Sequence, residues 1–144
     1  MNTFVIDACI AVKWVVEEYR TPEALALRQT ANLIAPEFLV AECANILWKK
    51  AQRQELLKQE ALIAARLLQG AEIELRPIRF LFEAATRMSI EIDHPAYDCL
   101  YLALAVETEC SFVTADERFL RKLHQGRQPK LRGRAISLIE AVKL

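Results

Sequence analysis

The chain contains four acidic side chains that are difficult to explain as ordinary hydrated surface. They are Asp7, Glu42, Asp98 and Asp116. Two of them, Asp7 and Asp116, follow short apolar runs that are typical of buried strands. Asp98 is the only charge in the apolar helical segment 96–106, and Glu42 borders the apolar stripe of another predicted helix. A buried carboxylate needs a cationic partner, and no Lys or Arg lies in either strand or beside Asp98 in its helix.

A shared divalent cation is the simplest partner for these carboxylates. A site rich in carboxylates and poor in histidines favours a hard cation such as Mg²⁺ or Mn²⁺. Such an ion polarises a phosphoryl oxygen and activates water, and a pair of ions can hold the attacking and leaving oxygens. The two histidines, His94 and His124, are too scattered for paired acid–base chemistry, and His94 is expected only to lead into a helix. The four acids therefore predict hydrolysis of a phosphodiester.

Each acid also has a purely structural explanation. Asp7 could do no more than cap the helix that follows it, and Glu42 could extend its carboxylate into water. The spacing of Thr114 and Glu117 predicts a helix-capping box, which leaves the acid between them in the first turn, facing outward. Asp98 is the hardest to explain in this way, although a helix N-terminus favours an anion. Because four independent explanations would be needed, we prefer one shared site.

Short strand-like runs alternate with helical patterns along the chain. The predicted strands are 3–7, 33–35, 73–77, 111–114 and 134–138, and the predicted helices are 8–16, 21–31, 36–53, 58–69, 79–89, 96–109, 116–123 and a short C-terminal one. This alternation predicts one helix-rich α/β domain over residues 1–144, with a parallel sheet covered on both faces. Ligands bind such sheets beyond the carboxyl ends of the strands, which is where Asp7 and Asp116 lie.

The composition limits the class of protein. Of the 144 residues, 53% are hydrophobic and only three are glycine, which argues against a disordered chain. The 19 basic and 19 acidic residues cancel, so any nucleic-acid-binding surface must be local. The four cysteines have no zinc-like spacing and are expected to be reduced, and Cys9, Cys43 and Cys99, which lie near the acids, are expected to pack in the core rather than to bind a metal. Without a signal peptide or an apolar run long enough to span a membrane, a cytoplasmic protein is expected.

One part of the chain is locally basic. Between residues 118 and 134 it carries seven basic residues and no acid: Arg118, Arg121, Lys122, Arg127, Lys130, Arg132 and Arg134. Because this basic segment directly follows Asp116, it could track the phosphates of a nucleic acid beside the acidic site. It could equally be a hydrated helix and loop.

Four parts of the chain are similar to a known family. Residues 4–14, the pair Glu42 and Asn45, residues 97–105 and residues 112–119 resemble the motifs of PIN-domain nucleases, and among these the VapC-type toxins of toxin–antitoxin pairs. The similarity covers essentially the whole chain, and its last two segments are the most specific. It implies a three-layer α/β/α fold with a short-stranded parallel sheet, and an endoribonuclease activity that depends on Mg²⁺ or Mn²⁺.

The resemblance also implies roles for particular residues. The family's catalytic carboxylates correspond to Asp7, Glu42, Asp98 and Asp116. Asp7 and Asp98 occupy the positions of direct metal ligands, and Thr114 matches a hydroxyl that supports the site. Cys9 stands where these proteins commonly have Ser. Because a thiol is a poor hydrogen-bond donor, the positioning of water or metal near Asp7 should be weaker here.

The partners that the resemblance implies are an RNA substrate, a cognate antitoxin protein and a second copy of the chain in a homodimer, without a membrane. The alternative within the same fold is an RNA- or DNA-processing nuclease with no toxin role. A response-regulator receiver is a further alternative, which the sequence disfavours. Such a domain needs an acidic pair after its first strand, where this chain has only Asp7. It also needs a phosphoacceptor Asp after its third strand, but the third predicted strand here ends in Arg76-Pro77. A binding module without catalysis would be supported by Cys9 alone.

Overall fold

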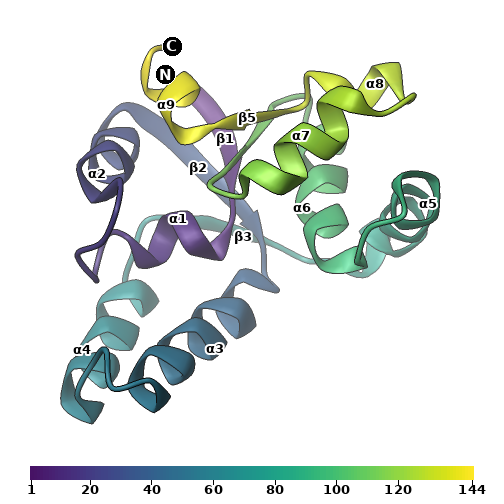
Figure 1. Ribbon diagram of the computed structural model, residues 1–144. Coiled ribbons are helices and arrows are strands. Elements are labelled where there is room, and N and C mark those ends of the chain that lie inside the picture. The colour runs from purple at the N-terminus through teal and green to yellow at the C-terminus, as the bar shows by residue number, and fades with distance from the viewer.

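A computed structural model describes all 144 residues, in which five strands alternate with nine helices (Figure 1). The strands are β1 (Asn2–Ile6), β2 (Ala31–Pro36), β3 (Glu74–Arg76), β4 (Ser111–Thr114) and β5 (Ala135–Ser137). The helices are α1 (Ala8–Val12), α2 (Thr21–Thr30), α3 (Leu39–Gln52), α4 (Lys58–Gln69), α5 (Phe82–Ile92), α6 (Ala96–Glu107), α7 (Glu117–Gln125), α8 (Pro129–Arg132) and α9 (Leu138–Val142). A 3-10 turn, η1 (Arg79–Leu81), precedes α5.

The five strands pair in parallel in one sheet with the order β3-β2-β1-β4-β5. β1 is the central strand, with Phe4 opposite Leu33 of β2 and Ser111 of β4. Val5 and Ile6 are fully buried, because helices cover both faces of the sheet. Parallel pairing brings the carboxyl ends of β1, β2 and β4 to the same edge of the sheet, and α1, α3 and α7 follow these ends directly.

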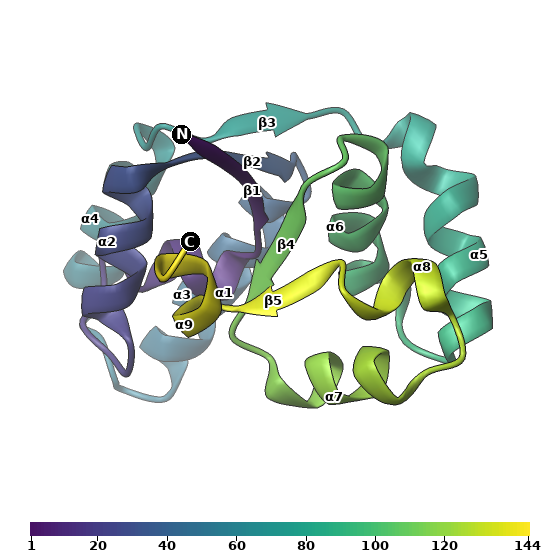
Figure 2. The same cartoon turned by 90° about the horizontal axis from the view of Figure 1, so that it is seen from above.

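Helices form a layer on each face of the sheet (Figures 1 and 2). On one face α6 packs across β1, β2 and β4, with α5 on its outer side and α7 beside β5. On the other face lie α1, α2 and α9, and the hairpin of α3 and α4 packs against α1. The predicted fold class, a helix-rich three-layer α/β/α arrangement with a short-stranded parallel sheet, is confirmed.

A set of stacked aromatic rings joins α6, β4 and α7. The ring centroids of Tyr101 and Phe112 are 5.4 Å apart with the planes 12° from parallel, and Phe119 meets the edge of Phe112 at 6.1 Å. All three side chains are fully buried. Such pairs stabilise a core by about 0.5–1.5 kcal/mol each beyond the area they bury. The stack therefore fixes the helices that carry two of the predicted acids.

The first predicted helix is shorter in the structure. It ends at Val12 rather than near residue 16, and Lys13, directly after the helix end, is buried. The Lys13 ammonium donates a hydrogen bond to the carbonyl of Tyr19 (2.8 Å) and lies 3.3 Å from a carboxylate oxygen of Glu18. These two contacts offset the cost of removing the Lys13 ammonium from water.

The helix predicted to start at Pro36 begins at Leu39 instead. Pro36 ends β2, and the N–H of Glu37 donates to the carbonyl of Arg76 (2.8 Å), which extends the pairing with β3. As a result Glu42 lies in the first turn of α3 and not in the middle of a helix. The short helix α8 was not predicted.

Candidate active site

Each of the four predicted acids lies in or just before the first turn of a helix. Asp7 is the N-cap of α1, and Asp116 is the N-cap of α7. Glu42 and Asp98 lie in the first turns of α3 and α6. α1, α3 and α7 start from one edge of the sheet, and a stacked aromatic pair holds the start of α6 against the start of α3. The fold therefore gathers the four acid-bearing helix starts at one end of the strands.

Asp7 is almost completely buried, with 6% of its surface exposed. Its Oδ1 accepts a hydrogen bond from the backbone N–H of Ile10 (3.1 Å), and its Oδ2 accepts one from the hydroxyl of Thr114 (2.6 Å). Burial is the main cause that raises the pKa of Asp7 to about 7; the two hydrogen bonds oppose the shift, and the charges of Asp98 and Glu42 add to it. Asp7 therefore holds a proton more readily in the metal-free protein than an ordinary aspartate does.

Glu42 is held by a residue that the sequence analysis did not single out. The hydroxyl of Tyr101 donates a hydrogen bond of 2.5 Å to Glu42 Oε1. Burial raises the pKa of Glu42, the hydrogen bond from Tyr101 opposes this, and the charge of Asp98 adds to it. Burial also raises the pKa of Tyr101, so its hydroxyl stays protonated as the donor. The hydroxyl of a tyrosine in an apolar helix was the available signal, because a buried tyrosine needs a hydrogen-bond partner.

Asp98 has a protein partner, so the expectation of an unpaired buried carboxylate was wrong. His94 Nε2 lies 2.6 Å from Asp98 Oδ2, and the Asp98 side chain is 32% exposed. The His94 ring packs against the ring of Phe119, with centroids 4.7 Å apart. His94 therefore does more than lead into a helix. Because His94 precedes α6, its four-residue spacing from Asp98 is not a pair within one helix and did not signal the contact.

Thr114 does not cap α7 in the way that its spacing from Glu117 predicts. Asp116 is the cap, because its Oδ1 accepts a hydrogen bond from the N–H of Phe119 (3.1 Å). The Thr114 hydroxyl accepts from the N–H of Asp116 (3.1 Å) and donates to Asp7 (2.6 Å). One hydroxyl thus connects the ends of β1 and β4 and supports the most buried acid.

The structure brings Asp7, Glu42 and Asp98 within electrostatic range of one another. Asp116 is exposed and is connected to Asp7 through Thr114. No three His, Cys, Asp or Glu side chains form a ready-made metal-binding cluster. The three acids other than Asp7 each have one oxygen in a hydrogen bond with a neighbouring group of the protein.

The donors at this place fit a hard divalent cation. The pKa values of the nearby thiols are raised to about 12 for Cys9 and Cys43 and to about 11 for Cys99, first by loss of hydration and then by neighbouring carboxylates. These thiols are therefore uncharged at neutral pH in the metal-free protein, and soft thiolates are not the ligands that a hard cation prefers. Cys43 and Cys99 are buried as expected, whereas Cys9 is exposed and does not pack in the core. Carboxylate oxygens remain, and Mg²⁺ or Mn²⁺ prefers such ligands.

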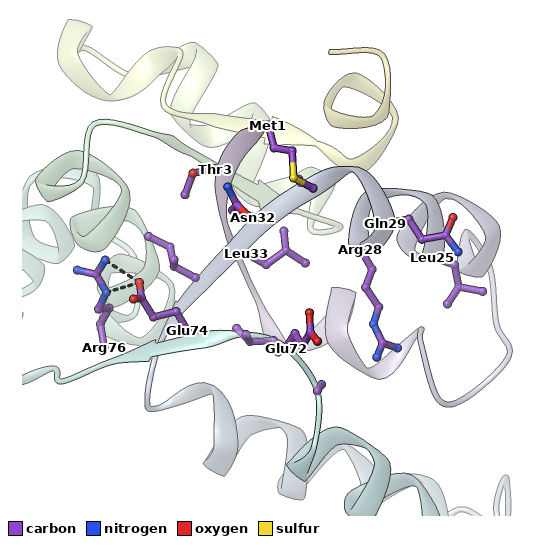
Figure 3. Close-up of a pocket in the computed structure, with 14 residues that line it drawn as sticks. Met1, Thr3, Leu25, Arg28, Gln29, Asn32, Leu33, Glu72, Glu74 and Arg76 are labelled. Atoms are coloured by element: carbon purple, nitrogen blue, oxygen red, sulfur yellow. Dashed lines mark hydrogen bonds and ion pairs between the residues drawn. The ribbon is translucent and has the colours of Figure 1, made fainter.

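A large open cavity lies at the opposite end of the strands (Figure 3). Its volume is about 1020 Å³, and it is lined by α2, by β1 and β2 near their starts, and by β3 with the segment that leads into it. The ion pair of Arg76 and Glu74, 2.7 Å long, lies along one wall. None of the four acids lines this cavity, so the size of a cavity does not identify the candidate site.

The basic segment is partly used for structure. Three of its residues donate hydrogen bonds to backbone carbonyls of neighbouring loops: Lys122, Arg132 and Arg134. Four others are exposed and engage no partner in a side-chain hydrogen bond or ion pair: Arg118, Arg121, Arg127 and Lys130. Arg118 and Arg121 lie on α7, which begins at Asp116. These four residues, rather than all seven, are the candidate phosphate contacts.

Comparison with known proteins identifies the family. Residues 4–123 match the PIN domain, and the chain belongs to this family. Its fold is similar to the crystal structure of PAE2754 from Pyrobaculum aerophilum, with a TM-score of 0.70 and 17% identical residues over 99% of this chain and 88% of that chain. At this identity the likeness concerns the fold alone. No curated protein sequence matches the chain significantly, and none of its helices is long and apolar enough to cross a membrane.

Proposed function

We propose that the protein is an Mg²⁺- or Mn²⁺-dependent endoribonuclease that acts as the toxin of a toxin–antitoxin pair. PIN domains are typically metal-dependent nucleases. The observation that carries the proposal is the gathering of Asp7, Glu42 and Asp98 at one end of the strands, within electrostatic range of one another. Asp7, with its pKa raised to about 7, lies in the electrostatic field of Glu42 and Asp98. A divalent cation is the charge that this arrangement lacks.

Asp7 and Asp98 are the proposed metal ligands, and Glu42 and Asp116 complete the catalytic set. A bound cation would supply positive charge at a phosphoryl oxygen and lower the pKa of water. Hydrogen bonds from Thr114 to Asp7 and between His94 and Asp98 orient the ligand carboxylates. Loss of such a supporting bond typically weakens metal binding or activity by about 10- to 100-fold.

Glu42 is the candidate general base. The Tyr101 hydroxyl occupies Glu42 Oε1, which leaves Oε2 to accept a proton from the attacking water. The raised pKa of Glu42 makes its carboxylate a better base near neutral pH. Water attacks the phosphorus in line with the leaving 3′ oxygen, so the products carry a 5′-phosphate and a 3′-hydroxyl.

A protein partner is also part of the proposal. An apolar groove of about 470 Å³ lies between α3 and α4, and ten of its 11 lining residues are hydrophobic. One of these is Cys43, which follows Glu42 in the chain. An antitoxin segment with apolar residues for the groove and basic residues for the acids would cover the site. The proposed unit is one domain over residues 1–144 that acts in the cytoplasm as a homodimer.

The nuclease proposal is tested with purified protein and single-stranded RNA and DNA. We expect cleavage of RNA with Mg²⁺ or Mn²⁺, little with Zn²⁺, none in EDTA and none by Asp7→Asn. The fragments should carry 5′-phosphate and 3′-hydroxyl ends. Cleavage in excess EDTA, or 2′,3′-cyclic phosphate ends, would contradict metal-dependent hydrolysis.

A PIN-domain nuclease that processes RNA or DNA without a toxin role is the alternative. Induction of the protein in cells separates the two proposals. A toxin should arrest growth, and co-expression of a small protein from a neighbouring gene should relieve the arrest. Metal-dependent cleavage without growth arrest would favour the processing nuclease, and mapping the cellular cleavage sites would then identify its substrate.

A further inference from the structure

Two aromatic rings stack beside the acidic residues. The ring centroids of Phe38 and Tyr97 are 5.3 Å apart, and the rings are within 10° of parallel. Phe38 immediately precedes α3 and packs against the hydrophobic core, whereas Tyr97, in the first turn of α6, is 61% exposed. One face of the Tyr97 ring is therefore covered by Phe38, and most of the residue remains accessible to solvent.

Each ring of the stacked pair lies one helical turn before a residue of the candidate site. Glu42 follows Phe38 by one helical turn, and its N–H donates to the Phe38 carbonyl (3.2 Å). Tyr101 follows Tyr97 by one turn, so the hydrogen bond between Tyr101 and Glu42 is the next layer of the same contact between α3 and α6. Asp98 directly follows Tyr97 in the chain. The open ring therefore borders the place where the phosphodiester would react.

We propose that Tyr97, backed by Phe38, is a stacking platform for an unpaired nucleobase of the RNA, next to the cleaved phosphodiester. The proposal rests on the nuclease function and narrows the substrate to single-stranded or looped segments. In a duplex the neighbouring bases cover both faces of each base, so that no face is available to a side chain. Every base has a π face, and the platform therefore selects for unpaired bases rather than for one sequence.

The surroundings of Tyr97 favour a binding role over a role in packing alone. A ring that only joined α3 to α6 would gain most from burial, but most of Tyr97 is exposed. The bond from Tyr101 to Glu42 already joins the two helices. Contact with Phe38 holds the Tyr97 ring in one orientation, which reduces the entropy lost when a base stacks on it.

Three substitutions separate stacking from packing: Tyr97→Phe, Tyr97→Leu and Tyr97→Ala. Phe keeps the π face, whereas Leu keeps an apolar contact with Phe38 but has no π face. Phe82→Leu on α5 is the matched control, since Phe82 is also an exposed aromatic residue, at 73%. Binding is measured by fluorescence with single-stranded RNA that contains 2-aminopurine and with its duplex. Ca²⁺ replaces Mg²⁺, and a gel checks that the RNA stays intact.

Tyr97→Phe and Phe82→Leu should bind like the parent protein. Tyr97→Leu and Tyr97→Ala should bind single-stranded RNA about 5- to 150-fold more weakly and lose the quenching of 2-aminopurine. The salt dependence of binding should not change, because no phosphate contact is removed. Thermal unfolding of Tyr97→Leu should match that of the parent.

Two results would overturn the platform while leaving the nuclease function intact. The first is that Tyr97→Leu binds single-stranded RNA as tightly as the parent does, while the parent still cleaves RNA. The second is an equal loss of affinity for single-stranded RNA and for its duplex. A parent protein that neither binds nor cleaves RNA would overturn the nuclease function, and the platform with it.

Discussion

The carboxylate of Asp7 has a pKa raised to about 7, mainly by burial, whereas an unfolded Asp titrates near ~3.9. Between these values the folded protein holds a proton that the unfolded chain has released. The protonated form of Asp7 therefore favours folding, and its contribution is fully present at low pH. As the pH rises from the unfolded-state pKa to the folded-state pKa, the free energy of unfolding decreases. Above the folded-state pKa this loss of stability stays constant.

We therefore expect Asp7→Asn to be more stable than the parent in EDTA at a pH of about 8, by roughly 2–4 kcal/mol. The difference should shrink toward a pH of about 4, as thermal unfolding across this range would show. Added Mn²⁺ is the control. Because only the parent binds Mn²⁺ well, the difference in stability between the two proteins should then shrink or change sign. A difference in stability that does not change with pH would mean that Asp7 does not titrate in this way.

Thr114 should be more important than its size suggests. Thr114→Val keeps the shape but removes the donor to Asp7 and the acceptor for the N–H of Asp116. We expect a loss of about 1–3 kcal/mol in the free energy of unfolding, because buried polar groups lose their partner. Thr114→Ser retains the hydroxyl and is the matched control. Chemical denaturation of both variants measures the difference, and equal stability would show that the hydroxyl contributes nothing.

His94 is expected to position Asp98. His94→Ala removes the contact at Asp98 Oδ2 and should weaken Mn²⁺ binding by about 10- to 100-fold, the usual cost of losing a group that orients a metal ligand. His124→Ala, on the exposed side of α7, is the matched control, because it is the other histidine of the chain. Calorimetric titration with Mn²⁺ gives both affinities. If the two variants bind alike, His94 has no part in the metal site.

Among the elements, α7 carries exposed positive charge and directly follows Asp116. Replacing Arg118 and Arg121 with Gln should weaken RNA binding and flatten its salt dependence, because fewer counterions are released. Exposed basic residues of α4 provide the matched control, with Lys58 and Arg66 changed to Gln. Affinities measured at several salt concentrations test this. An unchanged slope for the α7 variant would assign Arg118 and Arg121 to hydrated surface or to the antitoxin.

The elements themselves were largely predictable from the sequence. Apolar runs followed by helical patterns mark the strands, and the acids at their ends fall where parallel sheets bind ligands. The contacts that hold the acids were not predictable, because they join distant parts of the chain. Tyr101 and Glu42 are 59 residues apart, and Thr114 and Asp7 are 107 residues apart.

His94 was missed for a different reason. The residue before it, Asp93, adopts a left-handed conformation with φ of 51° at the end of α5. This turn brings His94 back against α6 and α7, where it meets Asp98 and Phe119. Asp tolerates the left-handed region better than most residues, but its presence does not require that conformation. Local patterns therefore could not predict the contact.

For the whole molecule, a divalent cation should act as a stabilising ligand. At a concentration of about 100 times its dissociation constant, Mn²⁺ should add about 2.7 kcal/mol to the free energy of unfolding. NaCl at the same ionic strength is the control and should have little effect. Thermal unfolding with each salt measures the shift. Equal shifts would indicate a general effect of ionic strength rather than a bound ion.

The central place of β1 has a consequence for synthesis of the protein. β1 is made before the other four strands of its sheet, yet one of its two neighbours is β4, and Asp7 bonds to Thr114 from 107 residues further along the chain. Contacts between such distant residues form slowly during folding. A nascent or truncated chain that ends before β4 lacks Thr114 and Asp116 and leaves one edge of β1 open to other strands. The acidic site can therefore assemble only after most of the chain has left the ribosome, and shorter fragments should aggregate rather than fold.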